Sequence, residues 1–202
     1  MINRPFSESS EQNKNVIYET IKPFLSDATQ VLEIGSGTGQ HAIHFASMVP
    51  ELVWQTSDLA ENLLTINAWI NDSRLPNLPE PIELDVSSRW INKTYDLIYS
   101  ANTFHIMNHD QVEQCLLRCT ACLKTGGYLI IYGPFNYDGK FTSASNEQFD
   151  SWLKSRDPLS GIKHFEWINQ LAGESGLQLV SDNAMPANNR ILIWQYETFA
   201  AQ

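Results

Sequence analysis

The sequence has few basic residues. Lysine and arginine together number 13, whereas aspartate and glutamate number 23, so the formal net charge is −10. Proteins that bind nucleic acids need clustered Lys and Arg side chains to neutralise phosphates. The composition therefore argues against a DNA or RNA partner.

The sequence also lacks a long apolar run. No stretch reaches the roughly 18 consecutive apolar residues that a membrane-spanning helix needs. Residues 1–15 are polar and contain no apolar segment of the kind found in secretory signals. We therefore expect a soluble, cytoplasmic protein without a membrane partner.

Cysteine is scarce, and three residues offer no disulfide framework, so we expect free thiols. The spacing of Cys115, Cys119 and Cys122 matches the iron–sulfur signature of radical enzymes. The same spacing is i, i+4 and i+7, which places all three on one helix face, where small buried cysteines need no cluster. The radical enzymes usually have an aromatic residue before the third cysteine, where this chain has Ala121. The helical interpretation is favoured, and we predict no metal site.

What the sequence does contain is an alternation of helical and strand patterns. With 202 residues and 43% apolar content, it can form one sizeable core, so we predict a single domain over residues 1–202. The fold class is α/β, a Rossmann-like, seven-stranded, mostly parallel sheet with flanking helices and a C-terminal antiparallel hairpin. The predicted strands cover residues 31–34, 52–58, 81–86, 95–100, 128–132, 177–180 and 191–196. The predicted helices lie near residues 16–25, 42–49, 63–70 and 112–123, and Gly126-Gly127 is expected to stop the last of these.

A long segment, approximately residues 136–175, separates the last parallel strand from the hairpin. It contains two helical patterns, around Phe149 and around Phe165, and is longer than a simple crossover requires. Insertions at the carboxyl ends of parallel strands often line a ligand crevice. We predict that this helical insertion covers the substrate side of the domain, and the alternative is an appendage that only packs on the sheet.

The most informative motif is a strand that runs into three glycines, Val31-Leu32-Glu33-Ile34-Gly35-Ser36-Gly37-Thr38-Gly39. Glycine tolerates positive φ and lets the backbone approach a ligand, which is typical of a site for a nucleoside-bearing cofactor. A dinucleotide motif places its third glycine where this chain has Gln40. A phosphate-binding loop would end in Gly-Lys-Ser/Thr, and no lysine is present here. Both of those cofactor classes are disfavoured.

The remaining pattern is an acidic residue, a spacer and Gly-x-Gly-x-Gly. It resembles the first motif of the class I S-adenosylmethionine-dependent methyltransferases, and Glu33 with the three glycines carries the resemblance. This cofactor has no phosphates but has a sulfonium, an amino acid end and a ribose diol, so it needs acceptors more than cations. Asp58, at the end of the next strand, suits the ribose hydroxyls, and the alternative is a cap for a helix near Glu61.

Two further strand ends complete the predicted site. Asp85 is placed to accept from the adenine amino group with Val86 against the ring, and the alternative is an Asp that opens a turn. The resemblance implies that the segment after the fourth strand passes beside the reactive methyl group. That segment lacks the Asn/Asp-Pro-Pro-aromatic tetrad of nucleic-acid amino-methyltransferases. His105 in it is the candidate general base, and the alternative is a structural histidine.

The resemblance extends to a small, largely uncharacterised family of methyltransferase-like proteins found in bacteria and animals. Its matching segments include Trp54 to Leu59, Ser100-Ala101-Asn102, Tyr132 to Asn136 and Met185 to Asn189. The resemblance implies S-adenosylmethionine as cofactor. The expected cofactor-binding residues are Glu33, Gly35, Ser36, Gly37, Thr38, Gly39, Asp58, Leu59, Asp85, Val86 and Asn102. The expected substrate-binding residues are Tyr132, Phe135, Asn136, Asn146, Arg156 and Asn188.

The sequence thus predicts methyl transfer from S-adenosylmethionine to a small-molecule acceptor, mainly by positioning and desolvation. The second hypothesis is a binding module that holds this cofactor without turnover and acts through a partner protein. A nucleic-acid enzyme ranks third because basic residues are few. No motif identifies the acceptor, the methylated atom or the oligomeric state.

Overall fold

The strands join into one seven-stranded sheet with the order β3-β2-β1-β4-β5-β7-β6. The structure is a computed structural model, and it describes residues 5–88 and 90–197. The strands are β1 (Gln30–Ile34), β2 (Val53–Asp58), β3 (Ile82–Glu83), β4 (Tyr95–Ala101), β5 (Leu123–Gly133), β6 (Leu177–Met185) and β7 (Asn189–Tyr196). The helices are α1 (Glu8–Leu25), α2 (Gln40–Met48), α3 (Leu63–Ser73), α4 (His109–Cys122), α5 (Ala144–Arg156) and α6 (Phe165–Glu174). Two short 3₁₀ turns, η1 (Ala60–Asn62) and η2 (Pro186–Asn188), complete the described elements.

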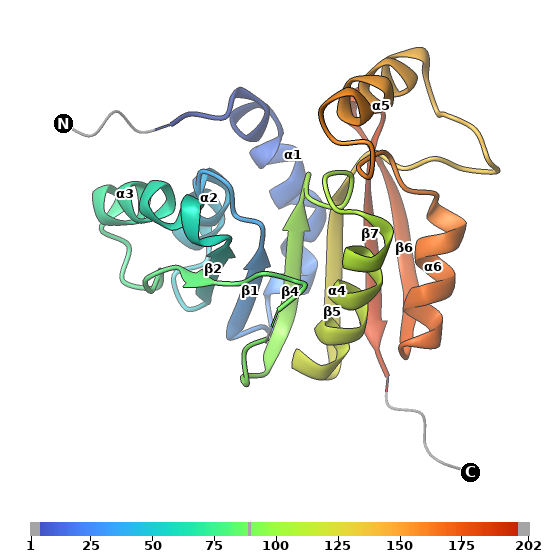
Figure 1. Ribbon diagram of the computed structural model, residues 1–202. Helices are drawn as coiled ribbons and strands as arrows, with labels where there is room; N and C mark the ends of the chain where they lie inside the picture. The colour runs from blue at the N-terminus through green and yellow to red at the C-terminus, as the bar shows by residue number, and fades with distance from the viewer. Residues whose placement is uncertain (1–4, 89, 198–202) are drawn as a thin grey trace, which may run out of the picture.

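The five strands β3, β2, β1, β4 and β5 pair in parallel, and β7 pairs antiparallel with both β5 and β6. This is the predicted mostly parallel sheet with a C-terminal hairpin (Figure 1). The chain order reverses between β1 and β4, because β1 continues to β2 on one side and β4 continues to β5 on the other. Ligands of open α/β sheets bind outside the carboxyl ends of the strands at such a switch point.

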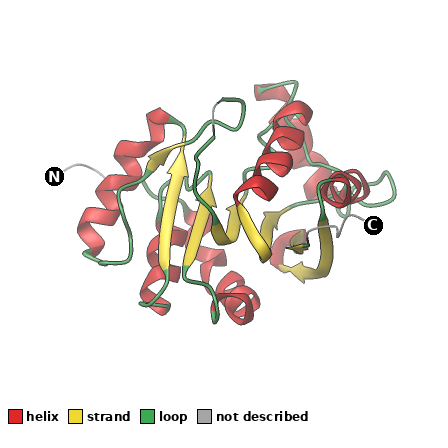
Figure 2. Ribbon diagram, turned by 90° about the horizontal axis from the view of Figure 1, so that it is seen from below, coloured by secondary structure: helices red, strands yellow, loops and turns green. Residues whose placement is uncertain are grey.

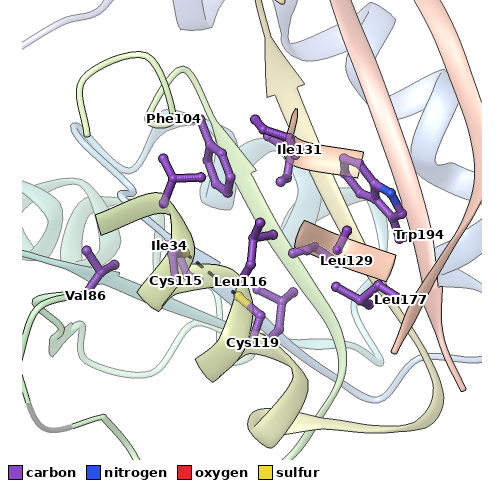
Figure 3. Packing of buried hydrophobic residues seen from close by; sticks show 14 of the residues in the cluster. Ile34, Val86, Phe104, Cys115, Leu116, Cys119, Leu129, Ile131, Leu177 and Trp194 are labelled. Carbon is purple, nitrogen blue, oxygen red and sulfur yellow. Dashed lines mark hydrogen bonds between the residues drawn. The ribbon is translucent and has the colours of Figure 1, made fainter. Parts of the chain in front are cut away.

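Helices cover both faces of the sheet, as Figures 1 and 2 show. Alternate residues along each strand enter two separate clusters, because successive side chains of a strand point to opposite faces. Leu32, Ile98 and Leu129 pack on α4 and α6, in the cluster drawn in Figure 3. Val31 and Leu97 pack on α1, α2 and α3. The result is a three-layer core with the sheet in the middle.

The three cysteines lie along α4, and all are buried in the first of these clusters. The Sγ atoms of Cys115 and Cys119 are 4.0 Å apart, and the Sγ of Cys122 lies 3.5 Å from the carbonyl oxygen of Ile91. Their common helix face, predicted from the i, i+4, i+7 spacing, is therefore part of the core (Figure 3). In residues 5–88 and 90–197, no group of histidine, cysteine and acidic side chains is arranged to hold a metal ion.

The bounds of several elements differ from the prediction: α1 begins earlier, at Glu8, and β6 continues to Met185. The third strand has only two residues, Ile82–Glu83, instead of spanning 81–86. The expected helix stop at Gly126-Gly127 is wrong, because α4 ends at Cys122 and both glycines lie inside β5. A Cβ on Gly127 would lie 2.8 Å from the carbonyl oxygens of Asp96 and Lys124, so close packing against β4 requires glycine there.

The insertion forms α5 and α6, as predicted. Ser143 caps α5 by accepting a hydrogen bond from the Asn146 amide. α6 packs against α4 on the face of the sheet, whereas α5 lies above the carboxyl ends of the parallel strands (Figure 1). None of the helices described is both long enough and apolar enough to span a bilayer.

Candidate functional site

The loop after β1 is held open by left-handed glycines. Gly35, Gly37 and Gly39 have φ angles of 70°, 58° and 84°, which other residues rarely adopt. A Cβ on Gly35 would meet the Thr103 hydroxyl at 2.6 Å, whereas a Cβ on Gly37 would meet nothing within 4 Å. The loop therefore packs against the segment after β4 at one glycine and faces open space at another.

Asp58, at the end of β2, fixes this loop. Its Oδ2 accepts a hydrogen bond from the Gly37 amide at 2.7 Å, and its Oδ1 accepts from the Leu59 amide and from Asn62 Nδ2, both at 2.8 Å. A carboxylate oxygen accepts about two hydrogen bonds, so Oδ1 is occupied and Oδ2 has one place left. Asp58 thus joins the glycine loop to the residues that follow β2 and still offers one acceptor, whereas the N-cap residue of η1 is Leu59, without a side-chain cap bond.

A cavity of about 720 Å³ lies over the glycine loop, at the switch point of the sheet; we term it the glycine-loop cavity. Four carboxylates line it, from Glu33, Asp58, Glu61 and Asp85. No lysine or arginine of residues 5–88 and 90–197 lines it. Such a wall suits a ligand that carries positive charge and hydroxyl groups, and it is unfavourable for a polyphosphate.

Glu33 is the most perturbed acid of this cavity. Its side chain is 2% exposed, and its Oε2 accepts a hydrogen bond from Trp54 Nε1 at 3.0 Å. Burial raises the pKa of Glu33 to about 7, although the bonds from Trp54 and Ser36 oppose the rise. A cation placed beside this carboxyl would ionise it.

Asp85 lies at the far end of the same cavity, after the short β3. Its Oδ1 accepts a hydrogen bond from the Ser87 amide at 2.8 Å, so the predicted turn is present. Because this bond uses one carboxylate oxygen, Oδ2 remains available to a ligand. Val86 is buried beside it and lines the cavity.

A second cavity, of about 860 Å³, adjoins the first beneath α5; we term it the α5 cavity. The two cavities share Ser9, Asn102 and Ile106 as lining residues. Asn102 has a φ angle of 57°, an unusual conformation for a residue other than glycine. Its backbone amide donates to the carbonyl oxygen of Tyr132 at 2.8 Å, and this bond holds the turn between the cavities.

His105 lines the α5 cavity and is 7% exposed. Its ring lies edge-on to Phe149, with the ring centroids 5.1 Å apart. Burial, together with the positive charge of Lys163, lowers the pKa of His105 to about 4. The imidazole is therefore neutral near pH 7 and can accept a proton or a hydrogen bond.

The loop that carries His105 is tied to the insertion. The Gly161 amide donates to the carbonyl oxygen of His105 at 2.9 Å. The buried Lys163 Nζ donates to the carbonyl oxygens of Met107 at 2.7 Å and Gly161 at 2.8 Å. These bonds join the segment after β4 to the insertion and so fix the wall of the α5 cavity.

Most predicted residues line one of the two cavities. The glycine-loop cavity contains Glu33, Gly35, Ser36, Gly37, Thr38, Asp58, Leu59, Asp85, Val86 and Asn102 from the predicted cofactor set. Gly39 is instead the N-cap residue of α2 and does not line it. The α5 cavity contains His105, Tyr132, Asn146 and Arg156 from the predicted catalytic and substrate sets.

Three predicted substrate residues do not line the α5 cavity. Phe135 is 1% exposed and belongs to the core beneath α4 and α6. Asn136 is buried. Its backbone amide donates to the carbonyl oxygen of Lys163 and its backbone carbonyl oxygen accepts from the Phe165 amide, so it holds the insertion in place. Asn188 bonds to two residues that do line the cavity: its backbone carbonyl oxygen accepts from Asn146 Nδ2 at 3.2 Å, and its Nδ2 donates to Ser145 Oγ at 3.3 Å. All three follow strand ends or turns, a position that does not determine which way a side chain points.

Several lining residues were not among those predicted. Ser9 and Asn13 of α1 reach the cavities from the N-terminal helix, and Asn13 Oδ1 lies 2.7 Å from His41 Nε2. Phe149 and Trp152 of α5 line the α5 cavity. Their i, i+3 spacing on an otherwise polar helix is the signal that could have identified this pair.

Comparison with known proteins identifies the fold. An O-methyltransferase family protein from Burkholderia thailandensis is 17% identical with a TM-score of 0.85, and the match covers 95% of this chain and 57% of that protein. Human N-acetylserotonin methyltransferase, solved with S-adenosylmethionine, is 16% identical with a TM-score of 0.80, over 95% and 53%. The mitomycin 7-O-methyltransferase MmcR is 16% identical with a TM-score of 0.75, over 94% and 57%. The chain therefore has the Rossmann-like fold of the class I methyltransferases.

The chain spans little more than half the length of these structures. A family model also matches it, over residues 4–196, and is described as "Protein of unknown function (DUF938)".

Proposed function

The chain belongs to the DUF938 family of proteins of unknown function. For this member we propose that it transfers a methyl group from S-adenosylmethionine to a small-molecule acceptor. The observation that carries the proposal is the meeting of two cavities at Asn102, Ser9 and Ile106. One cavity has the chemistry for the cofactor, and the other has room for an acceptor. Group transfer needs two such sites that open onto each other.

The glycine-loop cavity fits the cofactor in charge and shape. S-Adenosylmethionine carries a sulfonium, an ammonium and one carboxylate group, so its net charge is positive. Four acidic side chains line this cavity, and none of the lysines and arginines that the structure describes does. Gly37 faces open space, so the backbone can approach a ligand there. We assign Glu33 to the amino acid end, Asp58 Oδ2 to a ribose hydroxyl and Asp85 to the adenine amino group.

When bound, the cofactor supplies an electrophilic methyl carbon on sulfur. The protein then has to position the acceptor, exclude water and manage one proton. His105 lies in the α5 cavity and is neutral near pH 7, so it has the protonation state that a general base needs, although its lowered pKa makes it a weak base for the proton of a hydroxyl acceptor. Phe149 and α5 cover this cavity and shield the acceptor from solvent.

The direct test is calorimetric titration of the purified protein with S-adenosylmethionine, S-adenosylhomocysteine and NAD. Micromolar binding of the first two without binding of NAD is the expected result. A Gly37→Arg variant should lose this binding, because the new side chain would enter the cavity at a position with open space around it.

Gly126→Arg is the matched control. Gly126 also has a positive φ, 81°, and also faces open space, but it lies on β5 away from both cavities. Both variants therefore place an arginine at a position with a positive φ angle and open space around it. If Gly37→Arg keeps the affinity of the wild type, or if Gly126→Arg loses it equally, the assignment of the cofactor site is wrong. Binding without methyl transfer to any acceptor tested would favour the second hypothesis, a cofactor-binding module that acts through a partner protein.

A further inference from the structure

One wall of the α5 cavity is a row of planar side chains, three of them from α5 itself. The ring of His105 contacts Phe149 with centroids 5.1 Å apart, and Phe149 stacks on Trp152 with centroids 5.8 Å apart and planes at 16°. Arg156 Cζ lies 4.9 Å from the centre of the Trp152 ring. All four residues line the cavity.

The order of these groups follows from the helix. Positions 149, 152 and 156 are i, i+3 and i+7, which share one face of α5. At 1.5 Å of rise per residue, Phe149 and Arg156 are separated by about 10 Å along the helix axis. The wall therefore runs from a buried imidazole at one end to an exposed guanidinium at the other.

Arg156 forms no ion pair with an acidic side chain within residues 5–88 and 90–197. Its guanidinium instead makes a cation–π contact with Trp152. The nearby acids on α5 and after it form no ion pair with Arg156 in that described part of the chain. Asp150 pairs with Lys154 Nζ at 2.7 Å and accepts from the Ile162 amide. Asp157, which also lines the cavity, accepts from the Leu159 amide at 2.9 Å through Oδ1, and its Oδ2 stays available. The guanidinium donors of Arg156 thus remain free at the cavity mouth.

The two ends of the wall differ in the charge that they accept. A guanidinium binds a carboxylate through two parallel hydrogen bonds, and stacking on an aromatic ring orients it for this. The buried end holds a neutral imidazole and amides such as Asn146, and the nearby Lys163 ammonium donates to the carbonyl oxygens of Met107 and Gly161. An anionic group is therefore accommodated at the mouth, and an uncharged polar group is accommodated at the buried end.

We propose that the methyl acceptor is a planar aromatic acid, whose ring lies along Phe149 and Trp152, whose carboxylate binds Arg156 and whose hydroxyl points toward His105. This inference rests on the proposed function and names its substrate class. In the transfer, the hydroxyl oxygen forms the new bond to the methyl carbon, and the carbon–sulfur bond breaks with its electron pair remaining on sulfur. The hydroxyl proton moves to the imidazole and from there to solvent.

The test is a fluorescence titration of the protein, saturated with S-adenosylhomocysteine, with two probes. 6-Hydroxy-2-naphthoate has the hydroxyl and the carboxylate at opposite ends of a planar ring system, and 6-hydroxy-2-naphthamide has the same shape without the charge. We expect the wild type to bind the acid about tenfold more tightly than the amide, the size of one partly exposed charge-assisted interaction. Arg156→Gln should reduce the affinity for the acid to that for the amide and leave the amide unchanged.

Lys140→Gln is the matched control, because it removes one exposed positive charge from the same insertion outside the cavity. It should preserve the preference for the acid. Equal affinity of the wild type for both probes, failure of both to bind, or an unchanged preference in Arg156→Gln would each overturn the substrate class. Calorimetry with S-adenosylmethionine on the same samples distinguishes failure of the substrate class from failure of the proposed function. If one of these results is found while the cofactor still binds, only the substrate class is wrong. Absence of cofactor binding in the wild type would overturn both.

Discussion

Glu33 offers a prediction in which stability and cofactor binding change in opposite directions. The carboxyl is 2% exposed, and burial raises its pKa from an ordinary 4.5 to about 7. Because the folded pKa is raised, the folded state retains the proton at a pH where the unfolded state has lost it. The contribution of this group to stability is complete below pH 4.5 and is lost as the pH rises through about 7.

The magnitude follows from the two pKa values. One pKa unit corresponds to about 1.4 kcal/mol, so the wild type should lose roughly 2–3 kcal/mol of unfolding free energy between pH 5 and pH 8 through Glu33. Glu33→Gln removes the titration and keeps an oxygen for Trp54 Nε1. Any constant cost of the amide cancels when the same variant is compared at the two pH values.

The assay is urea unfolding of wild type and Glu33→Gln at pH 5 and pH 8 without ligand. We expect the variant to gain roughly 2–3 kcal/mol of unfolding free energy relative to wild type on going from pH 5 to pH 8. Under the proposed function, the affinity of the wild type for S-adenosylmethionine should rise up to tenfold per pH unit as Glu33 ionises below pH 7, and the variant should lack this rise. Parallel pH dependences of stability in the two proteins would refute the reasoning that burial holds the proton on Glu33.

Three further predictions concern the loops around the cavities. Gln40→Ala removes the side-chain bonds to the Ser7 amide and carbonyl oxygen, so we expect a loss of about 1–2 kcal/mol in urea unfolding and faster amide exchange in the first turn of α1; unchanged exchange would contradict this. His105→Ala should lower methyl transfer about 10²–10⁴-fold at constant cofactor affinity, measured by product formation and calorimetry; an undiminished rate would exclude a base. Gly35→Ala brings a Cβ within 2.6 Å of the Thr103 hydroxyl, so it should destabilise the fold by about 1–3 kcal/mol, and adding Thr103→Ala should restore part of that loss; the absence of rescue would show that the positive φ dominates.

The fold could be predicted from the sequence because the buried strands are short apolar runs separated by helical patterns. The expected helix end at Gly126-Gly127 is wrong, since a glycine pair after a helical pattern is the usual signal for a helix end but here lies inside β5. What decides its place is the approach of Gly127 to the Asp96 carbonyl oxygen on β4. That contact joins residues about thirty positions apart, so no local pattern contains it.

The two cavities were predictable to different degrees for a physical reason. Glu33, Asp58 and Asp85 follow from the sequence, because the end of a parallel strand determines where the next residue lies. The lining of the α5 cavity depends on how the insertion folds back onto the sheet. Phe135 therefore entered the core against expectation, whereas Trp152 reached the cavity without being predicted.

Lys163 shows how the fold makes that return specific. It is buried, burial lowers its pKa to about 8, and its Nζ donates hydrogen bonds to the Met107 and Gly161 carbonyl oxygens. A buried ammonium is costly unless its donors are satisfied, so it stabilises the docked insertion and penalises any arrangement that separates these two carbonyls. These two bonds thus fix the position of the segment that carries His105 relative to the insertion that carries Arg156. They therefore set the distance between the buried and exposed ends of the α5 cavity, on which the proposed substrate class depends.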